Sequence, residues 1–198
     1  MSFPTEEKQL LAYVRKIIDL TRAEEEVFAS KLIHRKYLKG QYVVQQGDVC
    51  KHESFVASGC LKSFYVDHEG QEHIVMFAIE DWWTGDLGSF VSQTEATLNV
   101  QCLEPSHLIQ ISYSSLEELY TAVPKFERFF RLIIQRAFAA SEKRIIKNFS
   151  MSAKERYLQF RKQYPQIEQR VPLYMIASYL GITKEFLSKI RHQLVVDQ

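Results

Sequence analysis

The chain is poor in the residues and patterns that mark several common protein classes. Its 198 residues include only 3 cysteines, 7 glycines and 5 prolines. Cys50, Cys60 and Cys102 are widely spaced and form no CxxC pair, which disfavours a disulfide framework, a zinc site and an iron–sulfur site. We therefore expect reduced, structural thiols and no metal-binding residues.

Long apolar runs are also absent. The most apolar stretch, around residues 74–79, is far shorter than the roughly 20 residues that a membrane-spanning helix needs. The N-terminal segment is acidic and amphipathic and lacks the apolar core of a signal peptide. The sequence therefore predicts a cytoplasmic protein. Its 46% of hydrophobic residues is enough to build the cores of one or two small domains.

A strong net charge is lacking as well, but the charges are unevenly distributed. The formal net charge is +1. Residues 1–124 carry 10 Lys and Arg against 18 Asp and Glu, whereas residues 125–198 carry 15 against 6. A basic C-terminal third on an acidic body indicates contact with a polyanion such as nucleic acid, although solvated helix faces can produce part of the same bias.

Residues 40–112 consist of short runs rich in Val, Ile, Phe and Tyr that are separated by glycines. Several short strands with turn signals about ten residues apart predict a compact antiparallel sandwich or barrel. The segment DHEGQE, residues 67–72, is a candidate hairpin loop. Residues 6–18 and 24–33 are predicted to form short helices before the strands.

Residues 125–149 contain neither proline nor glycine and predict one long helix. A mainly apolar stripe recurs along it at spacings of three and four: Phe126, Phe130, Ile133, Ala137, Ala140, Arg144 and Asn148. This stripe packs either on the chain's own sheet or on the same helix of a second chain, and a helix of about seven turns favours a homodimer. Ser152 and Glu155 form a capping-box pattern that begins another helix, so residues 149–152 are a candidate hinge.

The segment LYMIASYLGITKEFLSKIRHQL, residues 173–194, has the pattern of a helix-turn-helix. Gly181 can adopt the left-handed backbone of the turn, Ala177 allows the two helices to approach, and Thr183 is a suitable N-cap for the second helix. The shared core is predicted to contain five apolar residues: Ile176, Leu180, Ile182, Leu187 and Ile190.

The second helix presents polar residues that suit base edges and phosphates. The predicted DNA-binding residues are Thr183, Lys184, Glu185, Ser188, Lys189 and Arg191. Lysine can donate to guanine, glutamate can accept from cytosine, and a hydroxyl at a helix N-terminus can bond phosphate. The alternative is the solvated face of an ordinary terminal helix.

Taken together, these segments resemble the Crp/Fnr family of bacterial transcription regulators over nearly the full length of the chain. The resemblance rests on YLKGQYVVQQGD (37–48), SFVASGCLKSFYVDHEGQEHIVMF (54–77), GDLGSF (85–90) and GITKEFLSKI (181–190). It implies an α+β fold with a jelly-roll-like, cyclic-nucleotide-binding-type β-roll in residues 1–123, a dimerisation helix in 124–149 and a helix-turn-helix domain in 150–198. It also implies double-stranded DNA and a second copy of the chain as partners, with RNA polymerase as a further candidate, and no catalytic residues.

By the same resemblance, an effector pocket would involve Gly85, Asp86, Leu87, Gly88, Thr97 and Ser141. The arginine that ion-pairs a cyclic phosphate in this family falls on Ala96 here, with Thr97 at the neighbouring serine position. Since an unpaired phosphate in a partly buried pocket is costly, cyclic AMP is disfavoured. The sequence identifies no certain cofactor, so the roll either takes a different small-molecule effector or is a scaffold without one.

Two further departures leave alternatives open. Lysines 184 and 189 replace the usual arginines, and only four residues follow Leu194, too few for a wing hairpin. Contacts to the DNA backbone would then come from residues such as Arg170, Tyr174 or Lys154. The rival interpretation is a ligand-sensing or protein-interaction module that has lost specific DNA binding. A metal-dependent oxygenase or isomerase is disfavoured, because His52, His68, His73 and His107 lack the usual spacing of ligands.

Overall fold

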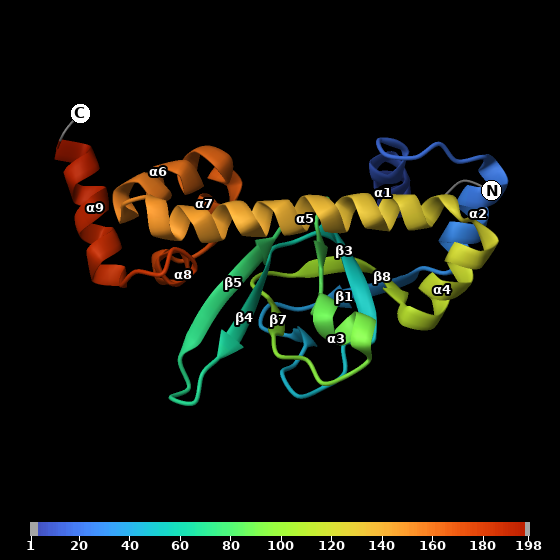
Figure 1. The fold of residues 1–198 in the computed structure, drawn as a ribbon, viewed down its shortest axis with the longest axis horizontal. Coiled ribbons are helices and arrows are strands. Elements are labelled where there is room, and N and C mark those ends of the chain that lie inside the picture. The colour runs from blue at the N-terminus through green and yellow to red at the C-terminus, as the bar shows by residue number, and fades with distance from the viewer. Residues whose placement is uncertain (1–3, 197–198) are drawn as a thin grey trace.

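The computed structural model describes residues 4–196 and has an N-terminal β-roll, a long central helix and a group of C-terminal helices (Figure 1). The helices are α1 (Thr5–Arg15), α2 (Arg22–Ser30), α3 (Leu87–Ser92), α4 (Tyr113–Ala122), α5 (Lys125–Ser150), α6 (Ala153–Gln163), α7 (Pro165–Arg170), α8 (Leu173–Tyr179) and α9 (Lys184–Val196). The strands are β1 (Ile33–Tyr37), β2 (Tyr42–Val44), β3 (His52–Ser58), β4 (Leu61–Val66), β5 (Glu72–Ala78), β6 (Trp83–Thr84), β7 (Asn99–Cys102) and β8 (Ser106–Ser112). The predicted α+β class is confirmed.

The roll consists of two antiparallel four-stranded sheets. The strand orders are β1-β8-β3-β6 in the first sheet and β2-β7-β4-β5 in the second. Strands β4 and β5 form the predicted hairpin, in which the Asp67 carboxylate accepts hydrogen bonds from the amides of Glu69 and Gln71 at 3.0 and 2.9 Å. Strand β5 lies at one edge of its sheet, so its outer edge needs other partners for its backbone groups.

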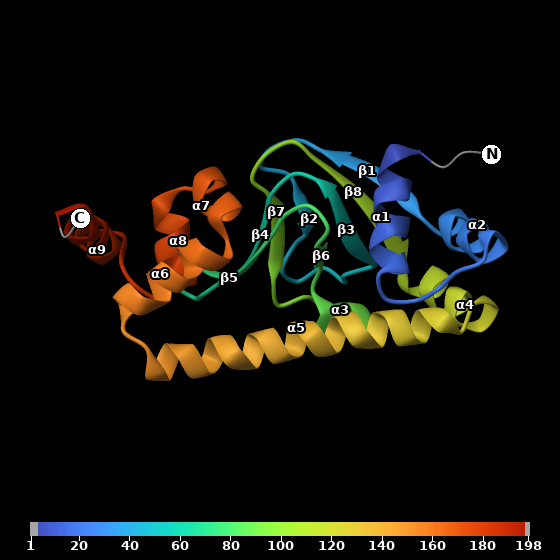
Figure 2. The same ribbon diagram turned by 90° about the horizontal axis from the view of Figure 1, so that it is seen from above.

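A first hydrophobic core fills the space between the two sheets and joins the roll to α1, α2, α4 and the N-terminal half of α5. Aromatic rings run through it in edge contact: Phe55 lies 5.6 Å from Trp83, and Trp83 lies 5.3 Å from Phe130. Figure 2 shows α5 lying alongside the roll for most of its length. This packing fixes the long helix to its own sheet.

A second core joins the second sheet to the C-terminal helices. It unites Phe64, Ile74 and Phe77 of the roll with apolar side chains of α6 to α9. The ring of Phe77 lies 5.5 Å from that of Tyr179, and Trp82 lies 5.7 Å from Tyr164. The C-terminal helices are therefore docked on the roll rather than attached only through the end of α5 (Figure 2).

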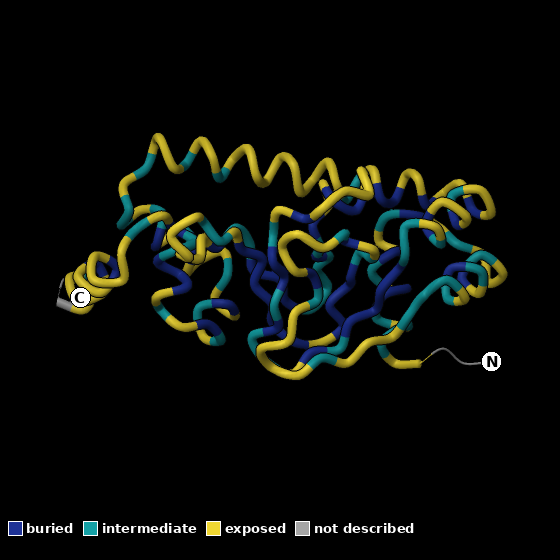
Figure 3. Tube along the Cα trace, turned by 90° about the horizontal axis from the view of Figure 1, so that it is seen from below, coloured by how far each residue is buried: buried dark blue, intermediate teal, exposed yellow. Residues whose placement is uncertain are grey.

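The apolar stripe predicted on α5 is buried at its N-terminal end, whereas Ala137, Ala140 and Asn148 further along it are exposed. Phe126 and Phe130 are buried in the chain's own core, and Arg144 donates to the carbonyl oxygen of Val75, so pairing of these residues with a second chain is wrong. A neighbouring stripe, rotated around the helix, carries the exposed apolar side chains instead: Ile134, Phe138, Ile145 and Phe149, with Ile146 beside it. The C-terminal half of α5 is largely exposed (Figure 3).

Other boundaries also differ from the predictions. The helix predicted to extend to residue 33 ends at Ser30, and Ile33 begins strand β1, which pairs with β8. Helices α3, α4 and α7 were not predicted. The long helix at Lys125–Ser150 and the capping box of Ser152 and Glu155 are confirmed. Within residues 4–196 no helix combines the length and apolar character that crossing a membrane requires.

Candidate nucleic-acid interface and effector pocket

The turn between α8 and α9 has the geometry that its sequence predicts. Gly181 adopts a φ of +67°, in the left-handed region that suits glycine. Its amide donates to the Ser178 carbonyl at 3.0 Å, and the Ile182 amide donates to the Ala177 carbonyl at 3.0 Å. This pair of bonds is a Schellman motif, which satisfies the last carbonyls of α8 and redirects the chain into α9.

The second helix is capped and packed as predicted. The Phe186 amide donates to the Thr183 hydroxyl at 3.2 Å, which provides an N-cap. Ala177, Leu187 and Ile190 are almost fully buried between the two helices. Arg156 was not selected by the sequence analysis. Its guanidinium donates to the Leu180 carbonyl at 3.2 Å and the Met151 carbonyl at 2.9 Å, linking the turn to the start of α6.

The predicted DNA-binding residues, here called the reading residues, lie on the outward side of α9. Their side chains are exposed: Lys184, Glu185, Ser188, Lys189 and Arg191, with Thr183 at the cap. Among the residues of this helix that the sequence analysis did not select, Phe186, which is 48% exposed, and His192 are also exposed. The helix thus presents donors, acceptors and an aromatic ring to solvent, which are the groups that base edges and thymine methyls require.

Arg170 is not available for the phosphate contact expected of it. Its guanidinium is held by Glu80 and Glu104 of the roll, so this expectation is wrong. Tyr174, in the first turn of α8, remains exposed at 52%.

In the expected effector pocket, Asp86 is bonded to the chain's own amides. One carboxylate oxygen accepts from the Ser89 amide at 3.0 Å and caps α3, while the other accepts from the amides of Thr97 and Leu98, each at 2.9 Å. Burial by itself would raise the pKa of Asp86, but these amides, with the Thr97 hydroxyl, hold it below its usual value. An internal carboxylate therefore occupies the amides that could otherwise hold an anion.

The other predicted pocket residues are only partly brought together. Thr97 contacts Asp86, whereas Leu87 and Ser141 are exposed on α3 and α5. Ala96, at the position of the missing arginine, is buried, and its amide and carbonyl bond Asp48 and Gly47 at 2.8 and 2.9 Å. The position thus offers no cation to a phosphate.

Beside this region lies a carboxyl group that the sequence analysis did not select. Glu53 is partly buried, and its Oε1 atom is fully buried without a hydrogen-bond partner. Gly85 makes room for it, since a Cβ there would lie 2.8 Å from that oxygen. Burial, and secondarily the charge of Asp86, raises the pKa of Glu53 to about 7.

The histidines of the roll lie at separate places. His73 contacts the Asp67 carboxylate at 2.6 Å beside the β4–β5 hairpin, whereas His107 lies 3.2 Å from His34 and 3.3 Å from Glu6. Within residues 4–196 no three His, Cys, Asp or Glu side chains are grouped so that they could hold a metal ion.

Comparison with known proteins gives a consistent picture. Residues 34–122 match the cyclic nucleotide-binding domain family. Regulatory protein HlyX of Actinobacillus pleuropneumoniae is 26% identical over 169 residues, covering 77% of this chain and 67% of that protein. The fumarate and nitrate reduction regulatory protein of Vibrio cholerae is 25% identical over 175 residues, covering 81% and 68%.

Solved structures share the fold. The structure of FixK2 from Bradyrhizobium japonicum superposes with a TM-score of 0.74 at 17% identity, covering 84% of this chain and 85% of that one. The c-di-GMP responsive global regulator CLP of Xanthomonas campestris gives a TM-score of 0.72 at 16% identity, covering 89% and 93%. In both cases the matched region covers most of this chain, so the likeness is one of overall fold.

Proposed function

We propose that this chain, which is homologous to FNR-type regulators and has the Crp/Fnr fold, is a transcription regulator that binds DNA as a homodimer. The observation that carries the proposal is the helix-turn-helix, whose packed inner side is complete and whose outer side presents exposed Lys184, Glu185, Ser188 and Lys189. In this proposal α9 enters the major groove, and Lys189 and Glu185 contact base edges.

The exposed stripe of α5 supports the dimer. Four large apolar side chains line it, of which Phe138 is 65% and Phe149 88% exposed. An exposed row of large apolar side chains on a long helix suits pairing with the same helix of a second chain. Two α9 helices held on such a dimer would read half-sites about 34 Å apart on a pseudo-palindromic site.

Cyclic AMP is not part of the proposal. The bonds of Asp86 to the amides of Thr97 and Leu98 place a negative charge where a phosphate would otherwise find donors, and Ala96 supplies no compensating cation. In this proposal the regulator works without cyclic AMP, and its roll is either a scaffold or the site of a different small-molecule ligand.

The experiment is a binding selection from genomic fragments with the purified full chain, without added ligand and at near-physiological salt. We expect a palindromic motif with half-sites about one helical turn apart. On the selected site, Lys189→Ala should weaken binding by about 1–3 kcal/mol for each protomer and relax the preference at the base that the lysine contacts. Lys39→Ala, an exposed lysine of the roll, is the matched control.

The rival function is a protein-interaction module without specific DNA binding. Weak, sequence-independent binding that Lys189→Ala leaves unchanged would favour it, and a repeat of the selection with cell extract would show whether a ligand restores a specific motif.

A further inference from the structure

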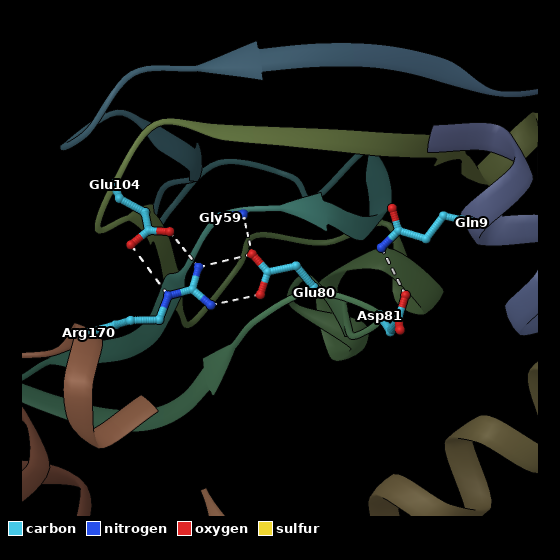
Figure 4. Close-up of polar contacts among 6 residues, drawn as sticks. All are labelled: Gln9, Gly59, Glu80, Asp81, Glu104 and Arg170. Carbon is cyan, nitrogen blue, oxygen red and sulfur yellow. Dashed lines mark hydrogen bonds and ion pairs between the residues drawn. The ribbon is translucent and has the colours of Figure 1, made fainter. Parts of the chain in front are cut away.

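Arg170 forms an ion-pair cluster between the C-terminal helices and the roll. It is the last residue of α7, and its guanidinium donates to both carboxylate oxygens of Glu80, at 2.7 and 3.0 Å, and also to Glu104 (Figure 4). Glu80 lies in the turn between β5 and β6, where it also accepts a hydrogen bond from the Gly59 amide at 2.8 Å. The guanidinium is therefore held bidentately by a carboxylate that is itself fixed to the roll.

Ser178, near the C-terminal end of α8, contacts the roll at the outer edge of β5. Its hydroxyl accepts a hydrogen bond from the Ile74 amide at 3.0 Å and donates one to the Glu72 carbonyl at 3.1 Å. These are backbone groups of an edge strand that no neighbouring strand pairs. One side chain thus takes the place of a strand partner for both of them.

One of these contacts lies just before α8 and the other near its C-terminal end. The orientation of α8 in turn determines that of α9. Arg170 lies three residues before α8 begins, and Ser178 is its penultimate residue. The Schellman turn at Gly181 and the buried side chains of Leu187 and Ile190 then fix α9 on α8. Because the reading residues of α9 stay exposed in this arrangement, the contacts orient the recognition helix without covering it.

We infer that Arg170 and Ser178 are positioning residues for DNA recognition, because they fix the recognition helix relative to the roll and the dimer helix. The inference rests on the proposed function. A dimer reads two half-sites at once only when its two α9 helices are held at the matching separation. If the contacts of Arg170 and Ser178 with the roll are lost, the two α9 helices must be ordered when the DNA binds, which lowers the affinity for the full site. A single half-site imposes no separation, so its affinity does not depend on these contacts.

The test compares the full palindromic site recovered by the selection with a DNA that carries only one half-site, using the full chain. We expect Arg170→Gln to lower full-site affinity by about 10- to 100-fold, in the range that multivalent linkage supplies, and half-site affinity by less than about 3-fold. Arg161→Gln is the matched control. It removes the same charge from the C-terminal helices, but its partner, Glu168 at 3.1 Å, lies within those helices. It should change both affinities equally.

Variants on the roll separate positioning from loss of charge near DNA. Glu80→Gln leaves the C-terminal helices untouched and should reproduce the selective loss, and combining it with Arg170→Gln should add little. Ser178→Ala, which changes no charge, should act in the same direction, so the inference stays testable if Arg170→Gln does not fold.

The outcomes distinguish the two levels of the proposal. Equal losses on full and half sites, or no loss with Arg170→Gln and Ser178→Ala, would overturn the positioning role while leaving the DNA-binding function intact. No sequence-specific binding by the unmodified chain would contradict the proposed function, and the positioning role with it.

Discussion

At the scale of single residues, Asp86 acts as a built-in anion that stabilises the loop between α3 and β7. It caps α3 by accepting a hydrogen bond from the Ser89 amide. It also accepts from the amides of Thr97 and Leu98, two residues that lie outside any strand or helix just before β7. Buried amides need such acceptors, because an unsatisfied donor costs about 1–3 kcal/mol. The residue that suggested an effector pocket therefore has a structural task.

We expect Asp86→Asn to lower the free energy of unfolding by about 1–3 kcal/mol at neutral pH, because an amide NH₂ would face the Thr97 and Leu98 donors. The pKa of Asp86 is lowered in the folded chain, so its contribution is full above its unfolded value near 4 and is lost as pH falls through the folded pKa. Urea unfolding between pH 7 and pH 2 measures both effects. Asp19→Asn, an exposed aspartate, is the control. An unchanged stability for Asp86→Asn would contradict this account.

Glu53 has the opposite pH dependence. Its folded-state pKa is raised to about 7, so the stability it contributes is full below its unfolded value near 4.5 and is lost as pH rises through 7. Glu53→Gln carries no charge at any pH in this range. We expect its Tm to be at least about 2–4 °C above that of the unmodified chain at pH 8, and this difference in Tm to shrink toward pH 5. Thermal unfolding at intervals across this range is the measurement, and a constant difference would show that Glu53 does not titrate here.

At the scale of elements, α5 carries two different faces. One face packs on the roll through Phe126 and Phe130, and the adjacent stripe exposes Ile134, Phe138, Ile145 and Phe149. An intrachain role explains the first face but leaves the second without a partner among the described residues.

We expect Phe138→Glu to dissociate the proposed dimer, because it places a charge in the middle of the apolar stripe while its own chain does not bury that side chain. The dimer dissociation constant should rise by at least about 100-fold, measured by sedimentation at micromolar concentration. Ala139→Glu introduces the same charge at an exposed position about 100° further around the helix and should leave the dimer intact. Equal effects of both variants would place the interface elsewhere.

How far the elements could be predicted depends on whether their signals are local. The turn at Gly181, the cap at Thr183 and the box of Ser152 and Glu155 are set by residues within a few positions, and all were predicted correctly. Strand β1 was not predicted, and its first residue, Ile33, was assigned to a helix, because the strand depends on pairing with β8, more than 60 residues away.

The same reason explains what was missed in the site. The contacts of Arg170 with Glu80 and Glu104 span sequence separations of 90 and 66 residues, so no local sequence pattern predicts them. For the apolar stripe of α5, packing on its own sheet and pairing with a second chain were both left open, because spacing alone does not show which face of a helix meets its own sheet. Only the three-dimensional structure distinguishes the buried face of α5 from its exposed apolar stripe.

At the scale of the whole molecule, the second core makes the C-terminal helices and the roll one packed unit. We expect a single unfolding transition in which tryptophan fluorescence and far-ultraviolet circular dichroism change together, because Trp82 of the roll contacts Tyr164 at 5.7 Å. Tyr164→Ala should shift the emission of the folded chain without altering its helix content. Two separated transitions, with helix content lost first, would show that the C-terminal helices unfold independently.

The outer edge of β5 gives the docked arrangement a second consequence. Ser178 of α8 satisfies backbone groups of this strand at Glu72 and Ile74. If the C-terminal helices left the roll, those groups and the apolar side chains of the second core would be exposed together. Unpaired strand edges of this kind pair with strands of other molecules. Conditions that release the C-terminal helices from the roll should therefore favour aggregation. The loss of soluble protein over time would measure how stable their docking is.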